Sequence, residues 1–285
     1  MRPWTARSVV TGATSGIGKA TAVALAGLGA QVVLVGRDRD RGAATAAEVA
    51  AAGASPPRLE IADLASMAQV RALAGRLGAL EHIDVLVNNA GLMAGRRRVT
   101  ADSFEEVFAV NHLAPFLLTN LLTSKLTAAA ARVITVTSDA HAAARLDLDD
   151  PQLARGWESW RAYANSKLAN ILFTRELARR LEGTRVTANC AHPGMVRTRF
   201  GREARLPLRA GVTLARPFML SPRRGADTIV YLATSPEVAA ATGGYYAKRQ
   251  RREPSAAARD DAAAKRLWQL SEELTGLTPA RPAGT

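Results

Sequence analysis

Short apolar runs alternate along the chain with longer segments whose apolar positions recur at helical spacing. The runs at 31–35 (QVVLV), 83–87 (IDVLV) and 132–136 (RVITV) are nearly continuous, which is typical of strands buried on both faces. Helix-forming residues dominate the segments between them, for example at 41–52 and 66–77. Buried strands separated by helices predict an α/β fold with a doubly wound parallel sheet and helices on both faces.

The same pattern extends over most of the chain. It predicts further strands at 8–10, 59–61 and 185–190, and further helices at 19–28, 104–125, 161–181 and 262–274. The stretch at about 200–224, with three prolines and many arginines, breaks this alternation and is predicted to be an inserted substrate lid. A helical tail is expected over about 255–285, with Trp268 and Leu270 as the residues through which its helix docks. We therefore predict one domain over residues 1–285, with the lid inserted near its end.

Composition narrows the class of protein. The 285 residues, 48% of them hydrophobic, are enough to bury a large core. The single cysteine, Cys190, cannot form an intrachain disulfide, which favours a reducing compartment. The N-terminal sequence does not resemble a signal peptide, and no apolar run reaches the ~18 residues of a membrane span. These features predict a cytoplasmic protein without a membrane span.

The net charge of +13 raises the question of a nucleic-acid partner. Arginine is scattered through every segment, and the two basic clusters, at 96–98 and 248–252, are not interleaved with aromatic residues. We therefore expect a solvated basic surface and no nucleic-acid partner. A contact with an acidic ligand or partner is the less favoured alternative for both clusters.

A glycine-rich turn joins the first predicted strand to the first predicted helix. The sequence TGATSGIG places Gly12, Gly16 and Gly18 there. Glycine lets the backbone turn sharply and approach a pyrophosphate, whose charge then lies at the helix N-terminus. The turn predicts a dinucleotide site of the Rossmann type, with a glycine-rich turn that binds no ligand as the alternative.

The residue after the second strand usually selects between the two nicotinamide cofactors. An acidic residue there would bind the adenosine ribose and select NAD. This chain has Arg37, with Asp38 one residue later, and a guanidinium suits a phosphate. We therefore predict NADP(H) over NAD(H). Lys19 adds positive potential in one interpretation and is an ordinary exposed helix residue in the other.

Two more strand ends carry polar or small residues. Asp63 and Leu64 follow the third strand, where the aspartate could bind the adenine or form a turn. The sequence NNAG at 88–91 closes the fourth strand. Its Asn89, Ala90 and Gly91 are small enough to let the backbone approach a cofactor, while the amides tie neighbouring strands together.

Tyr163 and Lys167 lie one turn apart at the start of the helix predicted over 161–181. Positions i and i+4 share a helix face, so a phenol and an ammonium could act together. By itself this spacing is common, and a half-buried tyrosine beside a solvated lysine is the simpler interpretation.

Taken together, these motifs resemble the short-chain dehydrogenase/reductase family from about residue 7 to 247. The matching pieces, in order, are TGATSGIG at 11–18, DL at 63–64, NNAG at 88–91, Asn111 in VNHLAPF, Ser138 in VTSDAH, YANSK at 163–167 and HPGMVRT at 192–198. YANSKLANILFTRELARRL, the HPG loop and LW at 267–268 are most similar to the retinol-dehydrogenase-like branch. Members of that branch often carry an N-terminal membrane anchor, and the start of this chain does not resemble one. A soluble bacterial-type ketoreductase therefore fits at least as well as a retinoid enzyme.

The resemblance implies a catalytic tetrad of Asn111, Ser138, Tyr163 and Lys167. Tyr163 would be the proton donor, with a pKa lowered by Lys167 and by oxidised nicotinamide, and Lys167 would also hold the nicotinamide ribose. Ser138 would bind the substrate oxygen. Asn111 would fix a water next to Lys167, or would instead satisfy backbone groups at a helix irregularity.

The resemblance also completes the set of cofactor-binding residues. Those implied in addition to the residues above are Thr14, Ser15 and Ile17 in the glycine turn and Pro193, Gly194, Val196 and Thr198 after the sixth strand. No metal is expected, because His112, His141 and His192, although predicted near the site, match no metal-ligand spacing. His141 is placed instead in the substrate pocket.

We therefore predict an NADPH-dependent carbonyl reductase or alcohol dehydrogenase acting on a bulky, lipophilic ketone or aldehyde, including a polyketide or other secondary metabolite. Three segments after strand ends, at 93–98, 140–160 and 200–220, would form the pocket. Their apolar residues are Met93, Leu146, Trp157, Trp160, Phe200, Leu206, Phe218 and Met219. Two alternatives remain: a non-catalytic NADP(H)-binding regulator, and an epimerase or dehydratase on the same fold. The sequence leaves open whether the chain is a monomer or a homo-oligomer.

Overall fold

The computed structural model describes residues 5–197 and 219–277. Eight strands form one sheet in the order β3-β2-β1-β4-β5-β6-β7-β8. The first seven are parallel, and β8 pairs antiparallel with β7. The strands are β1 (Arg7–Thr11), β2 (Gln31–Gly36), β3 (Arg58–Ile61), β4 (Val85–Asn88), β5 (Arg132–Val136), β6 (Thr187–His192), β7 (Tyr245–Ala247) and β8 (Gln250–Arg252).

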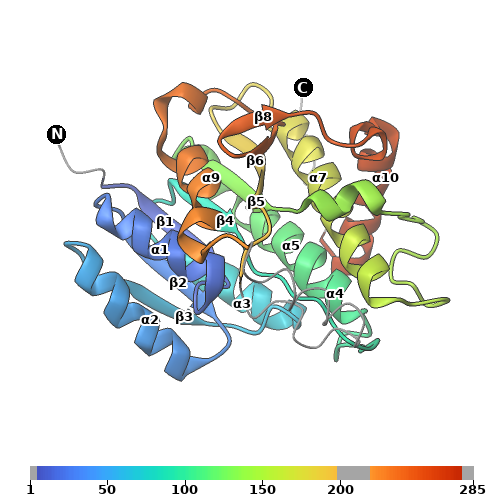
Figure 1. Cartoon of the computed structure of the whole chain (residues 1–285), viewed down its shortest axis with the longest axis horizontal. Coiled ribbons are helices and arrows are strands. Elements are labelled where there is room, and N and C mark those ends of the chain that lie inside the picture. Colours follow the sequence, from blue (N-terminus) through green and yellow to red (C-terminus); the bar gives the residue numbers. More distant parts are fainter. Residues whose placement is uncertain (1–4, 198–218, 278–285) are drawn as a thin grey trace.

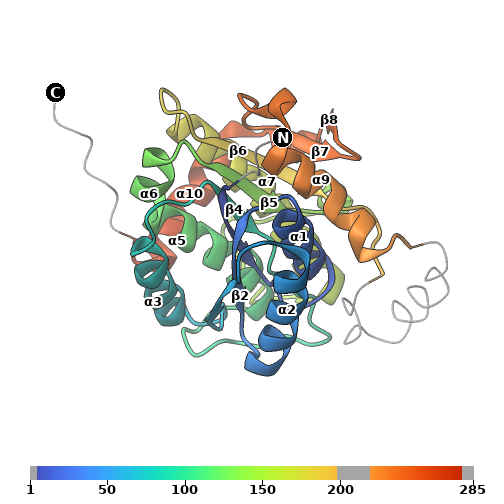
Figure 2. The ribbon, with the colours of Figure 1, turned by 90° about the vertical axis from the view of Figure 1, so that its left-hand side faces the viewer.

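Helices cover both faces of this sheet (Figures 1 and 2). One face carries α1 (Gly16–Gly27), α2 (Arg39–Ala52) and α9 (Pro222–Thr234), and the other carries α3 (Met67–Gly78), α5 (Ala114–Leu121), α7 (Ser159–Arg180) and α10 (Asp261–Thr275). A separate apolar core fills the space on each side of the sheet. The predicted α/β fold with a doubly wound, mostly parallel sheet is therefore confirmed, because apolar strands with no polar face require cover on both sides.

Strand order reverses between β1, which leads outward to β2 and β3, and β4, which leads outward to β5 and β6. At such a point the connections on the two sides diverge, and a crevice opens at the carboxyl ends of the strands. The turn after β1 and the segments after β4, β5 and β6 all converge there. These are the segments in which the sequence predicts a site.

Polar caps set where several helices begin. Asp38 accepts a hydrogen bond from the backbone N–H of Arg41 and starts α2. Glu158 accepts from the N–H groups of Trp160 and Arg161 and starts α7. Such caps satisfy N–H groups that the first turn of a helix leaves without partners. The start of α7 is therefore fixed one turn before Tyr163.

The predicted helix at 104–125 is not continuous. It consists of α4 (Glu106–Phe108), a π-helical turn η1 (Ala109–Leu113), α5 and α6 (Thr123–Ala128), with a break at Leu122. An apolar, helix-forming sequence does not reveal a π turn, because the extra residue per turn is held by tertiary contacts. The turn contains Asn111.

The segment after residue 219 also differs from the prediction. Pro222 to Arg224, placed in the lid by the sequence, form the first turn of α9, where Ser221 is the N-cap. Three elements, α9, β7 and β8, were not predicted from the sequence, and the basic cluster at 248–252 is the β7–β8 turn together with β8. Residues 200–218 of the predicted lid lie outside the described residues.

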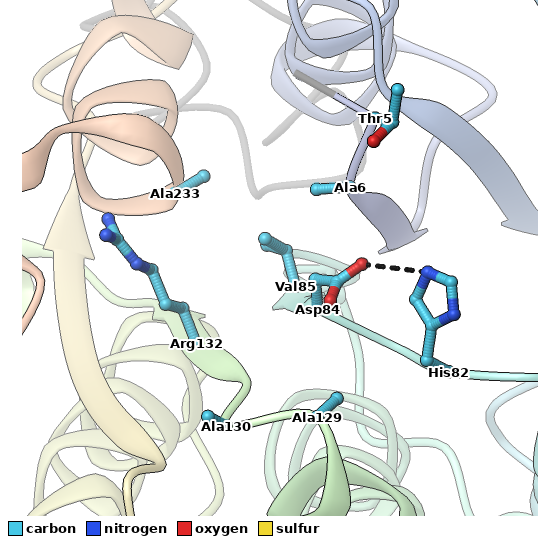
Figure 3. Close-up of a pocket in the computed structure, with 9 residues that line it drawn as sticks. All are labelled: Thr5, Ala6, His82, Asp84, Val85, Ala129, Ala130, Arg132 and Ala233. Atoms are coloured by element: carbon cyan, nitrogen blue, oxygen red, sulfur yellow. Dashed lines mark ion pairs between the residues drawn. The ribbon is translucent and has the colours of Figure 1, made fainter.

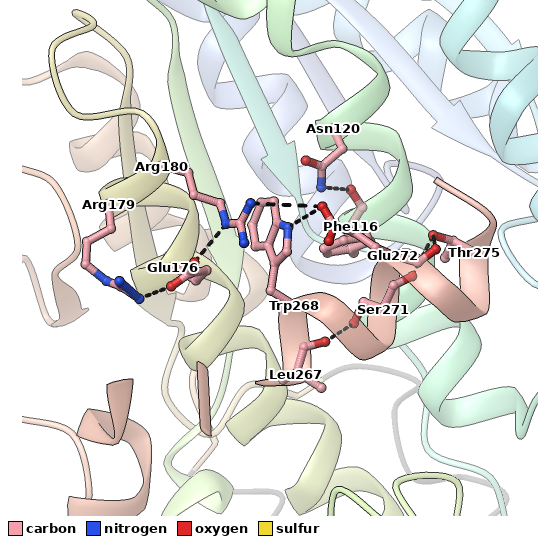
Figure 4. A network of polar contacts seen from close by, with 10 residues as sticks. All are labelled: Phe116, Asn120, Glu176, Arg179, Arg180, Leu267, Trp268, Ser271, Glu272 and Thr275. Carbon is pink, nitrogen blue, oxygen red and sulfur yellow. Dashed lines mark hydrogen bonds and ion pairs between the residues drawn. The ribbon is translucent and has the colours of Figure 1, made fainter. Parts of the chain in front are cut away.

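The C-terminal helix α10 packs along α7 and α5 (Figure 4). Trp268 stacks on Phe173 at 5.8 Å between ring centroids and meets Phe116 edge-on at 5.0 Å. The Arg180 guanidinium lies 4.3 Å from the centroid of the indole ring. The predicted docking of this helix through Trp268 is confirmed, whereas Leu270, the second predicted docking residue, is only half-buried and Leu267 is buried instead. Smaller 3-10 turns are η2 (Asp139–Ala143), η4 (Pro236–Val238) and η5 (Ala256–Arg259).

Among the described residues, no helix combines the length and the apolar character needed to cross a bilayer. A cavity of about 370 Å³ lies at the amino ends of β1, β4 and β5, where His82 and Asp84 face Arg132 across the opening (Figure 3). The Arg132 guanidinium donates hydrogen bonds to the carbonyls of Leu232 and Ser235 at the end of α9. This cavity is at the edge of the sheet opposite the predicted site.

Candidate functional site

The turn after β1 has the backbone that a bound pyrophosphate requires. Gly12 and Gly16 have φ angles of +64° and +55°, a region that disfavours residues with a Cβ. A Cβ at Gly18 would lie 2.3 Å from Asn89 Nδ2 and 2.4 Å from the Gly12 carbonyl oxygen. The three glycines therefore serve different purposes: two allow the turn, and the third lets α1 pack against it.

The N-terminus of α1 is left without a side-chain cap. Ser15 occupies the N-cap position but accepts no hydrogen bond from the helix, and the first turn contains no acidic residue. The first N–H groups of α1 therefore point out of the helix without partners, and the positive end of its dipole is not neutralised. This arrangement fits an anionic phosphate group, which would be held here together with the backbone of Thr14, Ser15 and Ile17.

Thr11 and Asn89 tie the glycine turn to the end of β4. Thr11 Oγ1 accepts hydrogen bonds from the N–H groups of Asn89 and Ala90, both at 3.0 Å. Asn89 Nδ2 donates to the Thr11 carbonyl at 2.7 Å. A Cβ at Gly12 would lie 2.8 Å from Ala90 Cα, so the two segments are in close contact. Asn89 therefore has the tying role that the sequence predicts, and Ala90 leaves space for the turn.

Arg37 is exposed directly after β2 and makes no hydrogen bond or ion pair with any described residue. The Asp38 carboxylate, in contrast, has two partners: it caps α2 and pairs with Arg41 Nε at 2.7 Å. These bonds hold the pKa of Asp38 below its usual value. Lys19 pairs with Glu48 at 2.8 Å. Arg37, directly after β2, is therefore a cation available to a phosphate, and the exposed Arg39 two residues later is a second one.

Asp63 and Leu64 follow β3 as predicted, and the structure shows a turn there. Asp63 Oδ1 accepts a hydrogen bond from the Ala65 N–H at 3.0 Å. Leu64 is buried and packs into the core on the α3 side of the sheet. The N-cap of α3 is Ser66, so Asp63 is not the helix cap. Its second carboxylate oxygen remains available to a ligand.

Asn111 lies fully buried in the π turn and uses both ends of its amide on neighbouring groups. Its Oδ1 accepts from the Leu92 N–H at 2.8 Å, and its Nδ2 donates to the Leu92 carbonyl at 2.9 Å. Nδ2 also donates to Ser166 Oγ at 2.9 Å. This geometry favours the interpretation in which the amide satisfies backbone groups at a helix irregularity. The side chain clamps the segment after Gly91: both amide N–H groups are used, and Oδ1 accepts one of the two hydrogen bonds it can accept.

Ser166, for which the sequence predicts no role, links this clamp to Tyr163. Its hydroxyl accepts from Asn111 and donates to the Tyr163 carbonyl at 2.7 Å. The π turn, the loop after β4 and the first turns of α7 are thus held as one unit. The proximity of Ser166 to Lys167 in YANSK was visible in the sequence, but its partners come from distant segments.

Tyr163, Lys167 and Ser138 are brought together from α7 and the end of β5. A side-chain hydrogen bond connects Tyr163 with Ser138. Lys167 Nζ lies 5.6 Å from the centroid of the Tyr163 ring and donates to the Val136 carbonyl at 3.1 Å. A Cβ at Gly91 would be 3.4 Å from Lys167 Nζ and 3.3 Å from Asn111 Oδ1. The predicted residues of the tetrad are therefore neighbours at the carboxyl ends of β4 and β5.

Burial shifts the pKa values of this pair in opposite directions. Removal from water raises the pKa of Tyr163 to about 12, although the hydrogen bond with Ser138 lowers it in part. Removal from water lowers the pKa of Lys167 to about 8. The protein groups around Tyr163 therefore do not give the lowered pKa that was expected from Lys167, and the lowering expected from oxidised nicotinamide stays a prediction. The phenol keeps its proton at neutral pH, and the ammonium is close to its titration range.

The three histidines predicted near the site lie in different places. His112 is fully buried among Phe108, Phe116 and Phe173, and burial lowers its pKa to about 3. Its placement at the site is therefore wrong. Among residues 5–197 and 219–277, no group of three or more His, Cys, Asp or Glu is close enough to hold a metal.

His141 was predicted to line the substrate pocket, and this is wrong as well. The ring is buried, with Nδ1 2.8 Å from the Ser138 carbonyl oxygen and Nε2 accepting from the Ser255 N–H at 3.1 Å. Because Nε2 is an acceptor, the proton is on Nδ1, which donates to Ser138. His141 therefore fastens the backbone of Ser138 to the segment before α10.

His192 ends β6, and its Nε2 lies 3.0 Å from Asp139 Oδ2. Asp139 also accepts a hydrogen bond from the Tyr245 hydroxyl. Burial lowers the pKa of His192 against the opposing effect of Asp139. The contact between Asp139 and His192 therefore ties the segment after β5, which contains Ser138, to the loop after β6, which begins at Pro193.

Pro193, Gly194 and Val196 form the loop after β6, as the resemblance implied. Gly194 has a φ angle of +80°, and a Cβ there would lie 2.8 Å from Leu220 Cδ1. Val196 pairs with Leu220 and lies against Gly225 at the start of α9. A Cβ at Gly225 would also meet Ile17, so this loop adjoins the glycine turn. Thr198 lies outside the described residues.

Some of the predicted pocket residues are buried beneath the loops, and another, Trp160, is exposed. Trp157 Nε1 donates to the buried Glu105 at 3.1 Å, and Met93 is buried, so both support the loops. Leu146 packs at the edge of the core. Trp160 is 40% exposed beside Tyr163. Phe200, Leu206 and Phe218 lie outside the described residues.

The doubly wound sheet, the glycine turn at its switch point and the buried Tyr–Lys pair define the class of protein: an oxidoreductase that uses a nicotinamide dinucleotide. The model of the family described as short chain dehydrogenase matches residues 7–208. Retinol dehydrogenase 14 of Mus musculus is 41% identical over 290 residues, which cover 94% of this chain and 85% of that protein. A protein of Streptomyces sp. (strain C5), described as a daunorubicin C-13 ketoreductase, DnrU, is 42% identical and covers 95% of this chain and 92% of its own length.

Solved structures agree with these relatives. An uncharacterized protein from Mycobacterium Paratuberculosis is 35% identical with a TM-score of 0.78, covering 95% of this chain and 93% of that one. The Pseudomonas aeruginosa RhlG/NADP active-site complex is 28% identical with a TM-score of 0.69, covering 87% and 98%. The chain belongs to the short-chain dehydrogenase/reductase family and is an oxidoreductase of alcohols and carbonyls, similar to the retinol dehydrogenases.

Proposed function

We propose that this chain is an NADPH-dependent carbonyl reductase for bulky, lipophilic ketones or aldehydes. The observation that carries the proposal is the buried Tyr163, protonated at neutral pH, hydrogen-bonded with Ser138 and one turn from Lys167. A protonated phenol is suited to donating a proton to a carbonyl oxygen that gains charge during reduction. The family relationship to a ketoreductase of daunorubicin supports a secondary-metabolite ketone as the substrate.

Each residue at the site has a distinct task in this proposal. The bound nicotinamide supplies the hydride. Ser138 and Tyr163 both hold the carbonyl oxygen, and Tyr163 transfers its phenolic proton to it. Lys167 places a positive charge beside the phenol, which stabilises the phenolate left after proton transfer. Asn111 and Ser166 position these groups and do not touch the reacting atoms.

The direct test is a screen of ketones and aldehydes, aromatic polyketides included, with NADPH absorbance followed over time. Stoichiometric consumption of NADPH with formation of an alcohol supports reduction. It also distinguishes a reductase from an epimerase or dehydratase, which would regenerate its cofactor. NADPH binding without turnover across the whole screen would favour a non-catalytic NADP(H)-binding protein.

The pH profile offers a second test. Lys167 has a pKa lowered to about 8 and Tyr163 one raised to about 12, so both are protonated at pH 6–7. As pH rises, Lys167 loses its proton first. We expect kcat/KM for carbonyl reduction to be flat near neutral pH and to fall as pH passes about 8. Steady-state rates over the range in which the protein stays folded check this, and a profile that stays flat to pH 10 would contradict the role of Lys167.

Preference for NADPH should depend on Arg37. We expect Arg37→Asp to lower the ratio of kcat/KM for NADPH to that for NADH by about tenfold or more, because a charge-assisted phosphate contact is replaced by repulsion. The matched control is Arg252→Asp on the exposed strand β8, which makes the same change in charge away from the site. If Arg37→Asp leaves the ratio unchanged and Lys19→Gln lowers it, the phosphate is held by Lys19.

A further inference from the structure

Trp160 combines exposure with a fixed place beside the proton donor. It lies in the first turn of α7, one turn before Tyr163, and its side chain is 40% exposed. The two ring centroids are 6.1 Å apart with an angle of 47° between the planes, which is a contact distance for aromatic pairs. An indole this exposed forgoes much of the stability that burial of its large apolar surface would give.

The neighbouring tryptophan shows what a supporting indole looks like in this fold. Trp157 donates its Nε1–H to the buried Glu105 and packs against Leu153 and Ala162. Trp160 makes no such bond, and its indole N–H has no partner among the described residues. The backbone N–H of Trp160 is fixed by Glu158, so the side chain is presented from a rigid helix start. Trp157 therefore stabilises the fold, whereas the exposed part of the Trp160 indole is available to a ligand.

We propose that Trp160 determines specificity by stacking against an aromatic ring attached close to the carbonyl group of the substrate. This inference rests on the proposed reductase activity. A substrate that delivers its oxygen to Tyr163 places the adjoining group within reach of the ring next to it. Planar aromatic rings gain from offset or edge contacts with indole, whereas a saturated ring of equal size gains only apolar burial. The substrate class is therefore an aryl aldehyde or aryl ketone.

The test compares 2-naphthaldehyde with its saturated analogue, decahydronaphthalene-2-carbaldehyde, in the intact protein with NADPH. The variants are Trp160→Leu, which keeps an apolar side chain, and Trp160→Phe, which keeps an aromatic ring. We expect Trp160→Leu to raise KM for 2-naphthaldehyde about two- to tenfold more than KM for the saturated aldehyde, with kcat little changed. Trp160→Phe should retain most of the preference.

For each aldehyde, the KM of the variant is divided by the KM of the wild type. This ratio removes the difference in intrinsic reactivity between the two aldehydes. Equal changes in KM for both aldehydes, or a loss in Trp160→Phe as large as in Trp160→Leu, would overturn the stacking role while the reductase activity stands. A wild-type protein that reduces neither these aldehydes nor any carbonyl of the screen would overturn the proposed function and this inference together.

Discussion

Replacement of Tyr163 by phenylalanine should lower kcat for carbonyl reduction by about 10²- to 10⁴-fold while NADPH still binds. Tyr163→Phe removes one hydroxyl group and its hydrogen bond with Ser138, while the ring keeps its contact with Trp160. We therefore expect the fold and the glycine turn to be unaffected. Neither neighbouring group is placed to take over the proton transfer. Lys167 Nζ lies 5.6 Å from the centroid of the Tyr163 ring and donates to the Val136 carbonyl. Ser138 is bonded to Tyr163 and the Ala140 N–H, and its hydroxyl is a far weaker acid.

The measurement is kcat and KM for one reduced carbonyl, together with the Kd of NADPH from fluorescence titration. Tyr231→Phe is the matched control, because it removes a phenol hydroxyl from α9, where Tyr231 binds Glu237 away from the site. Turnover in Tyr163→Phe equal to that of the wild type would exclude Tyr163 as the proton donor. Loss of NADPH binding would instead show that the hydroxyl matters for the cofactor.

Replacement of Trp268 by alanine should lower the free energy of unfolding by about 3–5 kcal/mol. The indole is 4% exposed, and it fills the space between α10, α7 and α5 (Figure 4). Alanine would leave a cavity next to Phe116 and Phe173, remove the cation–π contact with Arg180 and leave Glu272 without the indole N–H. The lost burial of apolar surface, the cavity and the lost polar contacts all lower the free energy of unfolding.

Urea unfolding followed by circular dichroism checks this prediction through the midpoint and the m-value. Leu28→Ala is the control, because Leu28 is exposed at the end of α1 and its loss should change stability by less than ~0.5 kcal/mol. Trp268 contacts the C-terminal half of α7, and Tyr163 lies near the N-terminus of that helix. The kcat of the folded variant should therefore change little. A loss of stability below about 1 kcal/mol would mean that α10 is not part of the cooperative core.

The positions of the site residues could be predicted where they depend on local sequence. The function of TGATSGIG can be predicted from the sequence, because glycine is favoured at the positive φ angles of residues 12 and 16 and a Cβ does not fit at residue 18. Tyr163 and Lys167 share a helix face by spacing alone. Asn111 was located by its motif, but the use of its amide was not, because its partners Leu92 and Ser166 come from a loop and another helix.

Other expectations failed because tertiary contacts decide them. His141 and His112 are adjacent to site motifs in the sequence, yet one ring ties Ser138 to Ser255 and the other is enclosed by phenylalanines. The pKa of Tyr163 was expected below its ordinary value because of Lys167 and oxidised nicotinamide, but burial raises it and outweighs the lowering by the hydrogen bond with Ser138. Helix α9 was missed because the sequence before it is rich in proline and arginine, and Pro222 was not recognised as its first residue.

The sequence by itself determined the alternation of buried strands and helices, the glycine turn at the start of α1, and the residue types Arg37, Ser138, Tyr163 and Lys167 at the strand and helix ends. These depend on periodicity and on local backbone constraints, which neighbouring residues encode. Only the tertiary structure decided which polar groups remain available to a ligand: Asp38, Lys19 and Asn111 are occupied by partners, whereas Arg37 and Trp160 have no such polar partner among the described residues. The physical reason is that hydrogen bonds, ion pairs and burial join segments far apart in the chain, and no local pattern records those contacts.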